Sequence, residues 1–190
     1  MIPSRQEIFN CIYGSWRLAR FDAAGVQFFD DSPAAALRSF FAAVLVAPAF
    51  IAMTLLTPGQ EESVQGAPVV LLVYALNYCL MWVVFPVIAY RICQAIDREK
   101  VFFRFLSANN WTSVIAFHLQ LAVAVLVVGN IFPDVLAVLL QLAMFVYLVV
   151  YQWFIARHCL DVSGPGAIGF VALQFLIALV IEGMILNILS

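Results

Sequence analysis

Charge is scarce in this sequence. Of its 190 residues, 11% are charged and 65% are hydrophobic, and the mean hydropathy is +1.04. A soluble domain carries about 25% charged residues, so this composition excludes an ordinary soluble protein and predicts an integral membrane protein. The formal net charge is -2. A nucleic-acid partner requires a clustered basic surface and a high pI, so we expect no nucleic-acid binding.

The signatures of catalysis and metal binding are also missing from the sequence. It has no Gly-x-Ser-x-Gly or His-Glu-x-x-His motif and no glycine-rich phosphate loop. The few His and Cys residues show no zinc spacing, and most of the cysteines fall on the side predicted to be reducing, which argues against disulfides. The sequence therefore predicts that the protein is not an enzyme and has neither a cofactor nor a metal site.

The chain does contain five apolar stretches, each close to the ~20 residues that cross a hydrocarbon core. The first begins near Phe40, and the residues before it are polar and aromatic, unlike a cleavable signal peptide. We therefore predict an all-α polytopic membrane protein, with a cytoplasmic or interfacial segment over residues 1–31 and a transmembrane domain over 32–190. The predicted spans are residues 40–56, 67–90, 111–128, 135–155 and 167–189.

All the Lys and Arg residues fall on one side of these spans, and the connections predicted on the other side, residues 57–66 and 130–134, contain none. Cationic segments resist translocation, so we predict a cytoplasmic N-terminus and a C-terminus on the far side. The excess of Arg over Lys, with many Ala and Val residues, indicates a GC-rich genome and hence a bacterial inner (plasma) membrane. The basic residues are Arg5, Arg17, Arg20, Arg38, Arg91, Arg98, Lys100, Arg104 and Arg157.

Residues 1–31 contain a predicted amphipathic helix. Apolar residues fall on one arc at helical spacing, with Gln6, Asn10 and Arg17 opposite them. Such a helix lies in the membrane interface with its apolar face toward lipid, or it packs on the inner face of the protein itself. The sequence leaves both alternatives open. The apolar arc consists of Ile8, Phe9, Ile12, Tyr13 and Trp16.

Residues 94–110 form a second mixed segment, in which charged residues alternate with phenylalanines. Basic and aromatic residues together favour another interfacial helix, which would contact anionic lipid. The alternative is a loop with a few buried phenylalanines. The residues expected at the lipid interface are Arg98, Lys100, Arg104, Trp16 and Trp111.

Glu182 is the acidic residue that lies deepest in a predicted span. A carboxylate in hydrocarbon is costly, so this side chain should face the helix bundle or water. It either binds a proton or a cation, or it holds helices together as a neutral carboxyl group that is hydrogen-bonded to Gln141 or Asn187.

His118 lies in the third predicted span, with Gln174 of the fifth span at matching depth. A histidine can shuttle protons near neutral pH, or it can form an interhelical hydrogen bond. Counted in residues from the ends of their predicted spans, His118 and Glu182 fall in opposite leaflets. A relay between them would therefore need water molecules and Asn77, whose depth is intermediate.

These features predict a scaffold, an accessory subunit, or a lipid-binding and membrane-organising protein, because two amphipathic segments accompany a chain without catalytic motifs. The alternative is a small proton- or ion-coupled transporter or channel that uses Glu182 and His118. The expected partners are membrane lipids and either another membrane protein or a second copy of the chain in a homo-oligomer.

A polar inner N-terminal segment, five spans, short outer loops and no tail resemble the bacterial Yip1-like membrane proteins. The resemblance covers residues 32–190 by topology alone, and it carries no functional residue over to this chain. It implies a trafficking or membrane-organising role.

Overall fold

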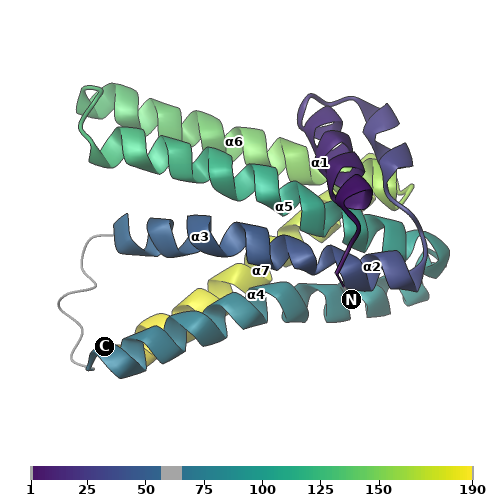
Figure 1. Cartoon of the computed structure of the whole chain (residues 1–190), viewed down its shortest axis with the longest axis horizontal. Coiled ribbons are helices and arrows are strands. Elements are labelled where there is room, and N and C mark those ends of the chain that lie inside the picture. Colours follow the sequence, from purple (N-terminus) through teal and green to yellow (C-terminus); the bar gives the residue numbers. More distant parts are fainter. Residues whose placement is uncertain (1, 57–65, 190) are drawn as a thin grey trace.

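The computed structural model describes residues 2–56 and 66–189, and the regular structure in this part of the chain is helical throughout. Five of its helices are long and apolar enough to cross a membrane, which confirms the all-α, five-span prediction. Most of the predicted connection over 57–66 lies outside the described residues. In chain order the elements are α1 (Arg5–Ala19), η1 (Ala23–Phe28), α2 (Pro33–Ser39), α3 (Phe41–Leu56), α4 (Ala67–Ala95), α5 (Glu99–Val128), α6 (Asp134–Cys159) and α7 (Gly164–Leu189) (Figure 1).

The first span combines α2 and α3, which follow each other with a break at Phe40 and together cover Pro33–Leu56. The Ser32 hydroxyl oxygen accepts a hydrogen bond from the Ala35 amide at 3.2 Å, and Pro33 occupies the first helical position. This combination fixes the start of the span, because Ser caps free amides and proline has no amide to satisfy.

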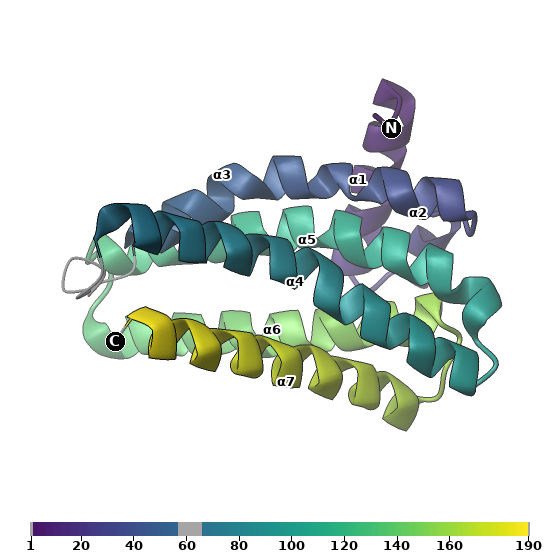
Figure 2. The ribbon, with the colours of Figure 1, turned by 90° about the horizontal axis from the view of Figure 1, so that it is seen from below.

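The long helices run back and forth, so their ends gather in two groups (Figures 1 and 2). The start of α2, the ends of α4 and α6 and the starts of α5 and α7 form one group. Every Lys and Arg residue of the chain lies in α1, next to it, or at this end of a long helix. We call it the cation-rich end. The C-terminus and the start of α4 lie at the opposite end (Figure 1).

The structure differs from the prediction over residues 94–110. α4 continues to Ala95, and α5 runs unbroken from Glu99, so no separate interfacial helix lies between the second and third spans. A continuous run from Phe105 to Thr112 is buried, because α1, α2, α3 and α6 all pack against α5. Trp111, which we expected at the lipid interface, is 1% exposed within this core.

α1 crosses the long helices rather than running along them (Figures 1 and 2). It has a packed face and, opposite it, an exposed face, each following helical spacing. The predicted apolar arc is divided between them, because Ile8 and Ile12 are partly buried against the core while the aromatic residues point away from it. The packed face contains Cys11, Ser15 and Leu18, and the exposed face contains Phe9, Tyr13 and Trp16.

Two tyrosines of α6 hold α1 in this orientation. The Tyr151 hydroxyl donates a hydrogen bond to the Ser15 carbonyl at 2.9 Å, and the Tyr147 hydroxyl donates one to the Ala19 carbonyl at 2.7 Å. Ala19 is the last residue of α1, so its carbonyl has no partner within the helix. The contact therefore satisfies a helix end as well as joining the two helices.

Contacts with η1 and α2 fix the rest of α1. A Cβ atom at Gly14 would lie 2.6 Å from the Cβ atom of Phe28, and one at Gly25 would lie 2.7 Å from the Gly14 carbonyl oxygen. The two backbones thus approach as closely as glycine permits. Near the start of α1, Arg38 Nε lies 2.8 and 2.9 Å from the two carboxylate oxygens of Glu7.

α5 is longer than the hydrocarbon core of a bilayer is thick. α5 has 30 residues and is therefore about 45 Å long, against about 30 Å of hydrocarbon. With the opposite helix ends at the far boundary, the cation-rich end projects beyond the near one. Tyr147 and Tyr151 of α6 then lie roughly 5–10 Å inside the near boundary. That is the depth at which amphipathic helices rest in a leaflet.

Candidate functional site

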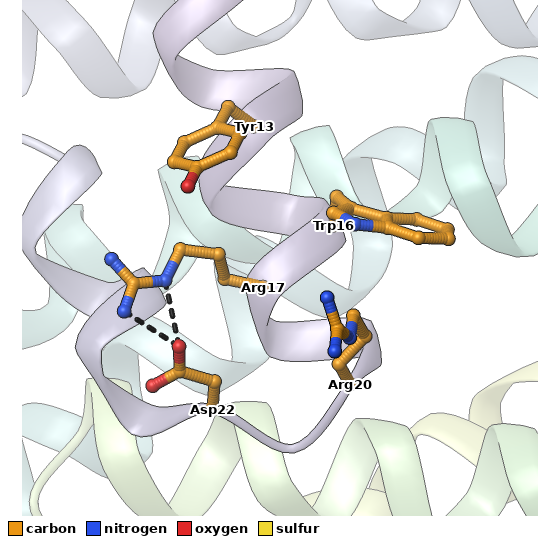
Figure 3. Close-up of a pocket in the computed structure, with 5 residues that line it drawn as sticks. All are labelled: Tyr13, Trp16, Arg17, Arg20 and Asp22. Carbon is orange, nitrogen blue, oxygen red and sulfur yellow. Dashed lines mark hydrogen bonds and ion pairs between the residues drawn. The ribbon is translucent and has the colours of Figure 1, made fainter.

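The exposed face of α1 carries a shallow hollow with a volume of about 340 Å³. We call it the α1 hollow, and Figure 3 shows its lining. The Trp16 ring and the Arg20 guanidinium lie beside each other, and Arg17 turns toward Asp22 (Figure 3). Trp16 is 52% exposed. The hollow thus combines aromatic surface with cationic groups.

The two arginines of the α1 hollow differ in their partners. Arg17 Nη2 and Nε lie 2.6 and 2.7 Å from Asp22 Oδ2. The hydrogen bond from Arg17, helped by one from the Ala24 amide, lowers the pKa of the Asp22 carboxyl below its ordinary value. Arg20 forms no ion pair with any residue that the structure describes. It is therefore the cation of the hollow that is free to meet an anion.

The predicted lipid-contacting cations at the start of α5 are mostly engaged with protein. Arg104 donates two hydrogen bonds to the Cys159 carbonyl, at 3.1 and 3.3 Å, and so caps the end of α6. Arg98 lies 3.4 Å from Asp161. Lys100 is exposed, and within residues 2–56 and 66–189 it has no ion-pair partner. Of these three cations, Lys100 is the one available to lipid.

A second hollow lies inside the bundle, between α4, α5, α6 and α7, and has a volume of about 340 Å³. We call it the amide groove. Figure 2 shows α4 and α5 on one side of this space and α6 and α7 on the other. The residues that line it include no charged side chain. The amide and hydroxyl side chains of its lining are Asn109, Asn110, Ser113, Gln120, Gln152 and Gln174.

Some of these amides join helices. Gln174 Nε2 of α7 donates a hydrogen bond to Asn109 Oδ1 of α5 at 3.0 Å, and Asn110 Nδ2 donates one to Ser39 Oγ of α2 at 2.9 Å. Both asparagines are buried. Amide pairs of this kind connect spans because lipid offers no alternative partner.

Two other amides are left over. Gln120 of α5 and Gln152 of α6 line the groove and are half-buried. Neither side chain has a hydrogen-bond partner among the residues that the structure describes. Their donors and acceptors are therefore available to whatever occupies the groove.

The other polar residues predicted within the spans do not meet. Glu182 is exposed on α7, because the adjacent residue Ile181 turns into the groove and successive helical positions differ by about 100°. His118 is exposed on α5, with Nδ1 2.7 Å from the Val114 carbonyl oxygen. Gln141 is exposed and Asn77 is half-buried, and neither lines the groove. Of the polar residues predicted within the spans, Gln174 is the one that lines the amide groove.

Asn109 and Asn110 were not among the site residues predicted from the sequence, although they stand at the end of residues 94–110, the segment predicted to be an interfacial helix. Two adjacent asparagines directly before an apolar run are a polar signal at a membrane boundary. That signal does not reveal the partners of the two side chains, which are Gln174 of α7 for Asn109 and Ser39 of α2 for Asn110.

The four cysteines are free thiols. Burial raises the pKa of the Cys11 thiol from 9.0 to about 12, with a smaller contribution from Glu7 and an opposing one from Arg38. In the described part of the chain, no group of three His, Cys, Asp or Glu side chains is placed to hold a metal ion. The chemistry of both hollows is accordingly that of hydrogen bonding, aromatic contact and isolated cations.

Comparison of the chain with models of known protein families, with curated proteins and with solved structures gave no match. The resemblance to Yip1-like membrane proteins therefore stays a prediction. By helix length and hydropathy the chain is a multi-pass membrane protein.

Proposed function

We propose that this protein organises lipid at one leaflet of its membrane and that α1 is its lipid-contacting element. One observation carries the proposal. α1 is held against the bundle by its packed face, while its opposite face exposes three aromatic side chains, two of which, Tyr13 and Trp16, line the α1 hollow together with the free cation Arg20. The exposed face contributes nothing to the protein core, so its aromatic side chains are available for an external contact.

The chemistry of this face suits the boundary between headgroups and acyl chains. Tyr13 and Trp16 are 44% and 52% exposed, and aromatic rings with a polar edge prefer the headgroup level. A cation near an anionic leaflet gains about 1 kcal/mol, which Arg20 and Lys100 can each obtain. Because α1 is anchored at both ends and in the middle, its insertion would displace lipid in one leaflet without bending the helix.

A scaffold function is the alternative use of the same face, with a partner protein in place of lipid. We do not extend the proposal to ion transport. The amide groove has no titratable lining residue, and His118 and Glu182 both lie on exposed helix faces.

The test compares two matched double variants of the full-length protein, reconstituted in vesicles with and without phosphatidylglycerol. Trp16→Ser/Arg20→Gln removes the ring and the cation of the α1 hollow. Leu37→Ser/Arg91→Gln removes an exposed apolar residue and an exposed cation elsewhere at the same end. The measurements are the phosphatidylglycerol that stays bound through gentle purification, by native mass spectrometry, and vesicle diameter by electron microscopy.

We expect the first variant to lose bound phosphatidylglycerol and any change in vesicle diameter, and the second to behave as the wild type. Equal retention by wild type and Trp16→Ser/Arg20→Gln would refute lipid organisation by α1. If the first variant instead loses a co-purifying membrane protein and keeps its lipid, the face is a scaffold surface.

A further inference from the structure

We propose that the amide groove binds an uncharged amphipathic lipid, with a hydroxyl- or carbonyl-bearing head and a single hydrocarbon tail. This inference concerns a surface inside the bundle, remote from the α1 hollow, and it does not depend on the function proposed for α1. The groove volume of about 340 Å³ lies within the ~300–1,000 Å³ of small-molecule sites.

The first argument is the neutrality of the lining. Six amide and hydroxyl side chains line the groove, and none of the lining residues is charged. A phosphate or another ion in a low-dielectric site needs an opposite charge to offset its lost hydration. Amides and a hydroxyl group offer donors and acceptors but no such charge. The lining therefore selects a ligand with an uncharged head group that both donates and accepts hydrogen bonds.

The second argument is a pair of unused amides. Gln120 and Gln152 face the groove from different helices, and within the described residues neither is hydrogen-bonded. An unsatisfied polar group in a membrane interior costs several kcal/mol. In contrast, Asn109 and Gln174 already satisfy each other at 3.0 Å. The groove is thus built with amides in excess of those that join its helices.

The third argument is that apolar walls accompany the amides. Gln152 of α6 lies in the half of its helix nearer the cation-rich end, and Gln120 of α5 lies in the half nearer the opposite end. Apolar side chains, among them Leu148 of α6 and Ile181 of α7, make up much of the remaining lining. A molecule that matches this lining has both polar groups for the amides and an apolar tail.

The fourth argument is access from the bilayer. Met81 of α4 and Phe175 of α7 both line the groove, and each is 40% exposed. A tail lying between Met81 and Phe175 would therefore continue into the surrounding lipid, so the ligand could enter sideways from the membrane.

The experiment uses the full-length protein in nanodiscs and, as the probe, a monoacylglycerol with a photoactivatable diazirine in its acyl chain. Labelling is measured against probe concentration, and labelled residues are mapped by peptide mass spectrometry. Competitors are unlabelled monooleoylglycerol, phosphatidylglycerol and hexadecane, which present a neutral head, an anionic head and no head.

We expect saturable labelling of α4 and α7 around Met81 and Phe175, with competition by monooleoylglycerol alone. Gln120→Leu/Gln152→Leu should weaken the apparent affinity roughly tenfold or more, because the hydrogen bonds that the two amides offer to the polar groups of the probe are lost. Gln141→Leu is the matched control, since Gln141 is an exposed glutamine of α6 outside the groove. It should leave labelling unchanged.

Non-saturable labelling would overturn the proposal and leave a groove filled by water or bulk lipid. Equal competition by phosphatidylglycerol would overturn it in favour of a phospholipid site, and equal competition by hexadecane would show that the amides do not recognise the head. These wild-type results decide the question even if the double variant does not fold. Trp16→Ser/Arg20→Gln should label normally, which separates this site from the α1 face.

Discussion

The hydroxyl group of Tyr151 in α6 donates a hydrogen bond to the backbone carbonyl of Ser15 in α1, and the two oxygen atoms are 2.9 Å apart. Tyr147, one turn away on α6, makes the equivalent bond to Ala19, one turn away on α1. Equal spacing on the donor and acceptor helices means that the pair fixes the direction of α1 as well as its position.

Replacing both tyrosines by phenylalanine should release α1 while the spans stay folded. Tyr147→Phe/Tyr151→Phe removes two hydrogen bonds and few packing contacts, so the free energy of unfolding should fall by about 1–2 kcal/mol. Hydrogen exchange of the α1 amides should become faster than in the wild type. Tyr13→Phe is the control, because Tyr13 is 44% exposed on the opposite face of α1. Unchanged exchange in the double variant would show that packing alone holds α1.

Gly14 should not tolerate alanine. The added Cβ atom would meet the Cβ atom of Phe28 at 2.6 Å, and overpacking of this kind costs about 1–3 kcal/mol. Gly183→Ala is the matched control, because the space around a Cβ atom there is empty to 4 Å and alanine gains about 0.5–1 kcal/mol in a helix. Thermal unfolding in nanodiscs should therefore move in opposite directions for the two variants. A Gly14→Ala protein as stable as the wild type would contradict the close α1–η1 contact.

Cys11 should be unreactive and should make unfolding pH-dependent only in strong base. Its pKa is raised from 9.0 to about 12 by burial, so the unfolded chain loses this proton at lower pH than the folded protein. The contribution to stability is complete below pH 9.0 and is lost as the pH rises toward about 12. Maleimide labelling of a variant that retains Cys11 as its single cysteine should be slow at pH 8 and fast after Gly14→Ala loosens α1. Rapid labelling of the intact protein would contradict this burial.

Replacing Glu182 by leucine should stabilise the protein in a bilayer. Its side chain is exposed on α7, and a carboxylate that faces lipid within a span costs about 2–3 kcal/mol on insertion scales. Thermal unfolding of Glu182→Leu in nanodiscs should shift upward, with Glu182→Gln intermediate. A loss of stability, or dissociation of an oligomer seen by native mass spectrometry, would mean that Glu182 contacts a second copy or a partner.

The five spans could be predicted because composition alone carries that information. A run such as residues 135–155 has the length and apolarity to cross a membrane, and the structure places α6 over Asp134–Cys159. The cation-rich ends of the helices were less predictable. Phe102 and Phe105 were interpreted as the apolar side of a surface helix, whereas they belong to the long α5 and are covered by protein.

The candidate sites are formed by contacts between residues far apart in the chain, which a local sequence pattern does not reveal. Gln174 could be proposed from its depth, and it does lie in the amide groove. The role of Tyr151 could not be foreseen, because its acceptor is a backbone carbonyl 136 positions away. A tyrosine near the end of a span is typical of the membrane interface, so the position of Tyr151 in the sequence does not indicate a contact with α1.

The long-range bonds of α1 also have a consequence for the timing of biosynthesis. α1 is made before the spans, but its anchor Tyr147 follows Ala19 by 128 positions. At typical translation speeds this delay is on the order of ten seconds. During that interval α1 can contact η1 and α2, but α5 and α6, on which it also packs, do not yet exist. α1 therefore reaches its final place only after the fourth span is made, and until then its packed face is open to chaperones, proteases or insertion factors.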